Sequence, residues 1–114
     1  MQSLVGRDAA QWIQSEFAKS PTLILPQLLD AANAGDDVDI RDGSRLHWKA
    51  LIGGDDQLRQ RVAYALSQIM VISDRDFFND PEIVAYYQDI LAENVFGNYR
   101  DLLEAVTYSP AMGR

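Results

Sequence analysis

The 114-residue chain contains no cysteine and only one histidine, His47. Without cysteine there are no disulfides, thiol nucleophiles, iron–sulfur clusters or cysteine-ligated zinc sites. A single imidazole excludes a metal site built from several histidines of this chain, and a catalytic triad with a second imidazole. Composition alone therefore removes several common kinds of site.

Long apolar runs and basic stretches are also missing. No run approaches the roughly 18 apolar residues that indicate a membrane-spanning helix, and the first seven residues lack the pattern of a signal peptide. Seventeen acidic and ten basic residues give a formal net charge of −7. Binding to phosphates would need a basic stripe. We therefore expect no transmembrane segment and no nucleic-acid partner.

The most regular stretch lies at about 56–73, where apolar residues recur at helical spacing. Asp55 and Asp56 open it, which suits the positive end of a helix dipole. We expect a central core helix here. Its apolar stripe includes Leu58, Val62, Leu66 and Ile69, and its polar face includes Arg59, Gln60, Ser67 and Gln68.

The remaining signals are helix caps, prolines and glycines, and no stretch alternates with the period of a strand. Asp8 is expected to cap the first helix, and Asn98 the last. The predicted helices cover about 8–19, 27–33, 44–52, 56–73, 81–96 and 99–108, and 34–43 is predicted to be a loop. With 47% hydrophobic residues, the chain predicts a single all-α domain over 1–114. We expect five to six helices in an orthogonal or bundle-like arrangement.

Several segments together resemble one bacterial family, DUF1800. Segment 56–69 reads DQLRQRVAYALSQI, 96–103 reads FGNYRDLL and 106–113 reads VTYSPAMG. Tyr86 and Tyr87 also fit, whereas Ser109 stands where a histidine often precedes Pro-Ala-Met in the family.

The resemblance implies a helical, exported protein of the periplasm or extracellular space, often encoded beside a sulfatase-like protein. It implies no established catalytic residues and no cofactor. Family members are typically longer, so we expect 1–114 to be an N-terminal fragment whose exposed apolar surface favours self-association.

An acidic segment offers the only metal candidates, Asp36, Asp37, Asp39 and Asp42. Calcium favours several oxygen ligands from one flexible loop. Counted from Asp37, however, Arg41 occupies the fifth ligand position and Trp48 the twelfth, where a calcium loop has glutamate. We favour a solvated acidic turn over a metal site.

Other candidate groups also have ordinary structural interpretations. His47 is favoured as a packed or surface residue. Arg59 and Arg61 point to different sides of the helix, and a buried salt bridge of one of them is favoured over anion binding. The second carboxylate cluster comprises Asp74, Asp76, Asp80 and Glu82, and the aromatic set comprises Phe77, Phe78, Tyr86, Tyr87, Phe96 and Tyr99. Paired carboxylates can perform acid–base catalysis and aromatics can line a groove, but we favour capping and core packing.

Two functions remain open. The first is a helical interaction or scaffold region that works with a protein partner. The second is part of an enzyme, with hydrolysis as one candidate reaction, whose active site is completed by residues beyond Arg114. An enzyme should show ionisable residues clustered in a concave pocket. An interaction region should show an apolar surface with a polar rim.

Overall fold

The computed structural model describes residues 8–77 and 79–113. Over these residues the chain forms six α-helices and one short 3-10 helix, without strands, so the predicted all-α, bundle-like fold class is confirmed. None of the described helices is long and apolar enough to cross a membrane. The elements are α1 (Ala9–Phe17), α2 (Leu25–Asn33), α3 (Ile40–Gly53), α4 (Gln57–Ser67), η2 (Asp74–Phe77), α5 (Pro81–Asn94) and α6 (Tyr99–Thr107).

The first and last helices begin at the predicted caps. The backbone N–H of Gln11 donates to Asp8 Oδ1 at 2.7 Å, and that of Asp101 donates to Asn98 Oδ1 at 2.9 Å. Each bond satisfies an N–H group that has no partner within its own helix. Local chemistry therefore fixes both starts.

The start of α3 differs from the sequence prediction. The sequence predicts a loop over 34–43 and a helix from 44, but the helix begins at Ile40. Asp39 is the cap, and its carboxylate accepts from the N–H groups of Arg41 and Asp42 at 2.8 and 3.1 Å. The Asp42 carboxylate in turn accepts from the Asp39 N–H, which completes a capping box.

The helix predicted over 56–73 ends earlier, at Ser67. Ser67 donates its hydroxyl to the carbonyl of Tyr64, and side-chain bonds of this kind compete with helix continuation. Beyond the helix, the Tyr87 hydroxyl donates to the Met70 carbonyl at 2.9 Å. A tertiary contact thus holds the chain after it leaves the helix, which the sequence pattern did not show.

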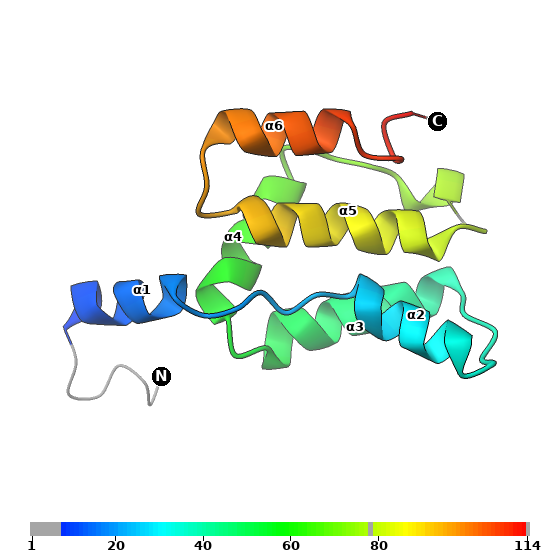
Figure 1. The fold of residues 1–114 in the computed structure, drawn as a ribbon, viewed down its shortest axis with the longest axis horizontal. Helices are drawn as coiled ribbons and strands as arrows, with labels where there is room; N and C mark the ends of the chain where they lie inside the picture. Colours follow the sequence, from blue (N-terminus) through cyan, green and yellow to red (C-terminus); the bar gives the residue numbers. More distant parts are fainter. Residues whose placement is uncertain (1–7, 78, 114) are drawn as a thin grey trace.

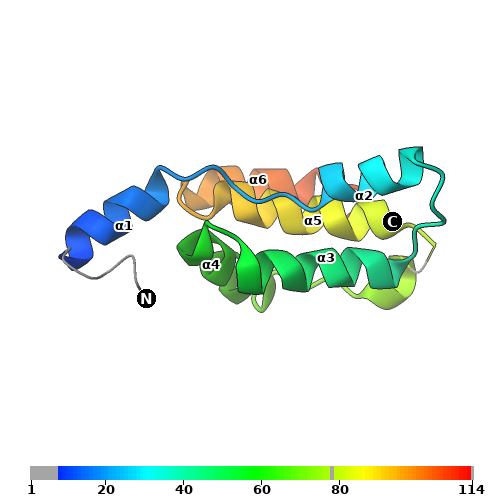
Figure 2. The ribbon, with the colours of Figure 1, turned by 90° about the horizontal axis from the view of Figure 1, so that it is seen from below.

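Helix α5 lies in the middle of the packing. It contacts α2, α3, α4, α6 and η2, whereas α4 contacts α1, α3 and α5. In Figure 1, α5 runs between α6 on one side and α2 with α3 on the other, and α1 extends from one end. Figure 2 shows the same extension of α1 away from the other helices.

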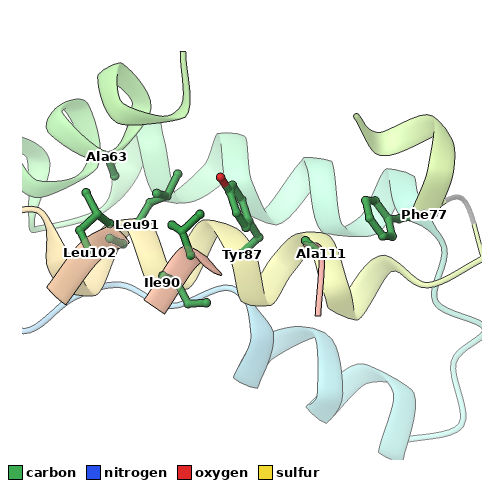
Figure 3. Close-up of a cluster of buried hydrophobic side chains, with 9 residues drawn as sticks. Ala63, Phe77, Tyr87, Ile90, Leu91, Leu102 and Ala111 are labelled. Atoms are coloured by element: carbon green, nitrogen blue, oxygen red, sulfur yellow. The ribbon is translucent and has the colours of Figure 1, made fainter. Parts of the chain in front are cut away.

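The main apolar core forms where α5 meets α4 and α6. Leu91 has 0% of its surface exposed and Tyr87 1%, and both belong to one buried cluster with Leu102 of α6 (Figure 3). Ile69 of the predicted apolar stripe and several large apolar residues of the helices are exposed. They are Ile13, Phe17, Leu29, Trp48, Ile52, Ile69, Tyr86 and Leu103. The periodicity identified the helices, but it overestimated how many apolar positions the domain covers.

Candidate functional site

Asp56 is buried at the start of α4, with 1% of its surface exposed. Its carboxylate does not cap α4 but accepts from Thr22, from the N–H at 2.8 Å and from the hydroxyl at 2.6 Å. Gln60 Nε2 donates to it at 3.1 Å. Burial raises the pKa of Asp56, but the hydrogen bonds from Thr22 and Gln60 outweigh this and leave the pKa below its usual value. A charged Asp56 therefore holds the connector between α1 and α2.

Asp89 of α5 holds the same connector further along. Its two carboxylate oxygens accept from the N–H groups of Ile24 and Leu25 at 2.7 and 2.8 Å, so Asp89 caps α2 from another helix. Burial raises the pKa of Asp89 to about 6, with a further contribution from the nearby charge of Glu93. The two N–H bonds oppose that rise without cancelling it.

Glu16 links α1 to the start of α4. It is buried (2% exposed) and its carboxylate accepts from the Leu58 N–H at 3.4 Å. Lys19 pairs with Glu16 and also donates to the Asp55 carbonyl. The pair therefore binds α1 to the polypeptide around the α3–α4 turn.

Arg59 is buried too, although it was predicted to lie on the polar face of α4. Its guanidinium donates to the Ala92 carbonyl at 2.9 Å and lies 4.8 Å from the ring centre of Phe96. The Ala92 carbonyl belongs to the last turn of α5, where carbonyls lack partners within the helix. The predicted salt bridge is not found among the described residues, because Arg59 caps the end of α5 instead.

These side chains share one task, which is to satisfy helix ends and an irregular connector with buried charges. We name them the polar junction. It consists of Glu16, Thr22, Asp56, Arg59, Gln60 and Asp89. Each carboxylate of the junction is bonded to at least one backbone N–H group, so all three have a structural role.

A different region is open. A cavity of about 260 Å³ lies between α3, residues 72–74 and the first half of α5. Its lining is mostly apolar and includes Ile24, Ile72 and Ala85, with Trp48 half exposed. A second cavity of about 240 Å³ shares His47, Ile72 and Gln88 with the first. We name the two together the α3–α5 groove.

His47 lies in both cavities of the groove. Its Nδ1 atom is buried and has no hydrogen-bond partner among the described residues. Burial lowers the pKa of His47, which favours the neutral imidazole. Ser44, Ser73 and Asp74 also line the first cavity, so the groove has polar groups beside an apolar floor.

The acidic segment has structural contacts of its own. Asp39 and Asp42 form the capping box of α3, and Asp42 also pairs with Arg45 at 3.1 Å. Asp36 and Asp37 are exposed beside another cavity, next to Val38. Across the described part of the chain, no group of three or more His, Asp or Glu side chains is placed to hold a metal ion.

The remaining sequence candidates do not converge on one site. Among the carboxylates, Asp74 lines the α3–α5 groove and Asp76 a separate cavity against Phe77. Asp80 precedes α5 without capping it through its side chain, and Glu82 lies in the first turn. Of the aromatics, Phe77 and Tyr87 are buried, Phe96 packs on Phe17, Tyr86 and Tyr99 are exposed, and Phe78 lies outside the described residues.

Sequence reasoning missed Asp89, Glu16 and the groove. Asp89 could have been noticed, because it shares a helical face with the buried Ala85 and Ala92. A carboxylate on an inward face needs donors. The groove has no comparable local signal, because it joins residues from α3, the 72–74 segment and α5.

The fold and the site define an all-α helical module with a buried polar junction and an open apolar groove. The model of the family described as "Protein of unknown function (DUF1800)" matches residues 1–114, the whole chain. The chain therefore belongs to the DUF1800 family, as its sequence motifs indicated. No curated protein and no solved structure matches it.

Proposed function

We propose that this chain is a helical interaction region that works with a protein partner. One observation carries the proposal: the α3–α5 groove is a hollow lined by both apolar and polar residues, with a half-exposed tryptophan. Energetically important residues of protein interfaces are enriched in tryptophan and cluster around well-packed pockets. An apolar centre with a polar rim is the usual anatomy of such an interface.

The hydrogen bonds of the polar junction support the same conclusion, because they argue against a catalytic role for its carboxylates. Asp56 and Asp89 are the most deeply buried carboxylates beside Glu16, and they already accept backbone hydrogen bonds. A general acid or base must reach the proton that it transfers. The buried charges are therefore better explained as supports of the fold that presents the groove.

Affinity capture of the full-length protein from its native cell envelope tests this function. We expect a stoichiometric protein partner to co-purify, and the sulfatase-like neighbour that the family resemblance implies is the first candidate. Trp48→Ala should reduce recovery of the partner, whereas Tyr108→Ala, at a position with 83% exposure on α6's end, should leave it unchanged. Absence of any partner under gentle conditions would refute the proposal.

A second function, part of a hydrolytic enzyme completed by residues beyond Arg114, is favoured by one observation. His47 has a buried Nδ1 without a partner, and it lines the same cavity as Ser44, Ser73 and Asp74. A neutral imidazole is the form that can accept a proton. Hydrolytic activity of the full-length protein that disappears in His47→Ala and survives in Trp48→Ala would favour the enzyme.

A further inference from the structure

The size and lining of the first cavity in the α3–α5 groove restrict what it can take. Its volume of about 260 Å³ is near the lower end of the roughly 300–1,000 Å³ of pockets that hold drug-sized ligands. Ile24, Ile72 and Ala85 make part of an apolar floor, and a buried apolar surface favours an apolar occupant. The space therefore suits a single large apolar side chain.

Gly43 lies in the lining of the cavity and inside α3. Glycine within a helix is less favourable than alanine by about 1 kcal/mol. Packing does not require it, because a Cβ atom at position 43 would meet nothing within 4 Å. Gly43 therefore lines the cavity without a side chain, at a cost to the helix.

The end of the molecule that holds this cavity is acidic, and Asp74 lines the cavity itself. Segments 36–45 and 74–82, which flank or include its lining residues, carry eight acidic and three basic residues. Their formal charge of 3 − 8 = −5 is most of the chain's −7. In Figure 1 the loop after α2, the start of α3, η2 and the start of α5 lie at the same end of the molecule. A segment that docks there is favoured if it carries basic residues.

We propose that the α3–α5 groove anchors one large apolar side chain of a protein partner, and that lysine or arginine residues flank that side chain. This inference rests on the proposed function and adds the chemistry of the partner's segment. The apolar side chain enters beside Trp48 and Gly43. The flanking basic residues face the acidic segments, so added salt weakens the contact.

Site-specific photo-cross-linking in the producing cell tests the proposal with the full-length protein. The photoreactive residue benzoylphenylalanine replaces Trp48 at the groove, or Tyr108 as a matched exposed aromatic on a different helix. We expect a discrete protein adduct from position 48 only. Mass spectrometry should map the adduct to a segment in which an apolar residue is flanked by lysine or arginine.

Two glycine variants make the test specific. Gly43→Leu fills the cavity, whereas Gly53→Leu changes a glycine at the end of the same helix that also has nothing within 4 Å of a Cβ. We expect Gly43→Leu to reduce the adduct from position 48 by about tenfold or more, the effect of losing one good contact. Gly53→Leu should leave it unchanged. Leucine favours helix more than glycine does, so both variants should fold.

Several outcomes would overturn the proposal. An adduct that persists in Gly43→Leu shows that the cavity is not used. An adduct to a lipid, to a second copy of this chain or to an acidic segment identifies a different occupant. If affinity capture recovers a partner but position 48 gives no adduct, the groove assignment fails while the proposed function stands. If no partner is captured at all, that result refutes the proposed function on which the groove assignment rests.

Discussion

The polar junction and the α3–α5 groove both place ionisable side chains away from water, but Asp56 of the junction and His47 of the groove differ in their hydrogen bonding. In the junction, Asp56 accepts three hydrogen bonds from Thr22 and Gln60. In the groove, His47 Nδ1 has no partner in the described part of the chain. Arg59 of the junction also has a buried Nε without a partner in the described part of the chain, so the difference is between the junction's hydrogen-bonded carboxylates and His47. The contrast separates structure from function within one small domain.

The largest expected effect comes from breaking the junction at Asp56. Asp56→Ala leaves the Thr22 N–H and hydroxyl without an acceptor in a buried position. We expect the free energy of unfolding to fall by about 3 kcal/mol, as is typical when a buried charged acceptor is removed. Urea unfolding measures it. Asp55→Ala, at the exposed neighbouring position, should change stability by less than about 0.5 kcal/mol.

The second effect is a pH dependence that originates at Asp89. Its pKa of about 6 in the folded state is above the ordinary aspartate value of 3.8, so the folded protein binds more protons between these values. The contribution of Asp89 to the free energy of unfolding is therefore greatest below about pH 4 and falls as pH rises to 6. His47 acts in the opposite direction, because its lowered pKa makes the folded state bind fewer protons.

The contribution of Asp89 is isolated by comparison with Asp89→Asn. Between pH 4 and pH 7 the wild type should lose roughly 2 kcal/mol of stability relative to the variant, which carries no charge at this position. Urea midpoints at several pH values measure the difference. A difference that stays constant across this range would contradict the account of Asp89.

A smaller effect is expected at Gly54, where the junction meets the end of α3. A Cβ atom there would lie 2.6 Å from the Ala50 carbonyl oxygen and 3.0 Å from Asp56 Oδ1. Gly54→Ala should therefore destabilise the protein by more than about 1 kcal/mol. Gly53→Ala introduces no such contact and should be neutral or stabilising, as thermal unfolding of the two variants can show.

The smallest effect is expected in the groove itself. His47→Leu removes an imidazole whose Nδ1 has no hydrogen-bond partner in the described structure. We expect stability to change by less than about 1 kcal/mol, because no hydrogen bond to Nδ1 is lost. Urea unfolding gives the value. A loss of unfolding free energy as large as that of Asp56→Ala would show that His47 is structural. It would remove the contrast between the groove and the polar junction.

Much of the fold could be predicted from local signals. The caps at Asp8 and Asn98 and the proline at the start of α5 act within a few residues, so the sequence identifies them directly. Ser67 was not recognised as a helix end, because a tertiary bond from Tyr87 holds the chain beyond it. Local rules give the elements, and long-range bonds decide some of their limits.

The site was harder to predict for the same reason. Arg59 and Gln60 have the polar character of an exposed face, and only the positions of the α5 carbonyls and of Thr22 explain their burial. The groove brings together residues that are far apart in sequence. The periodicity of the sequence does not predict that these distant residues lie together.

The most direct test of the polar junction is amide hydrogen exchange in the connector between α1 and α2. The N–H groups of Thr22 and Ile24 donate to Asp56 and Asp89, whereas that of Leu23, between them, has no carboxylate acceptor among residues 8–77 and 79–113. We predict slow exchange at Thr22 and Ile24, close to the rate of core amides, and fast exchange at Leu23. Equally fast exchange at all three would contradict the claim that buried carboxylates hold this connector.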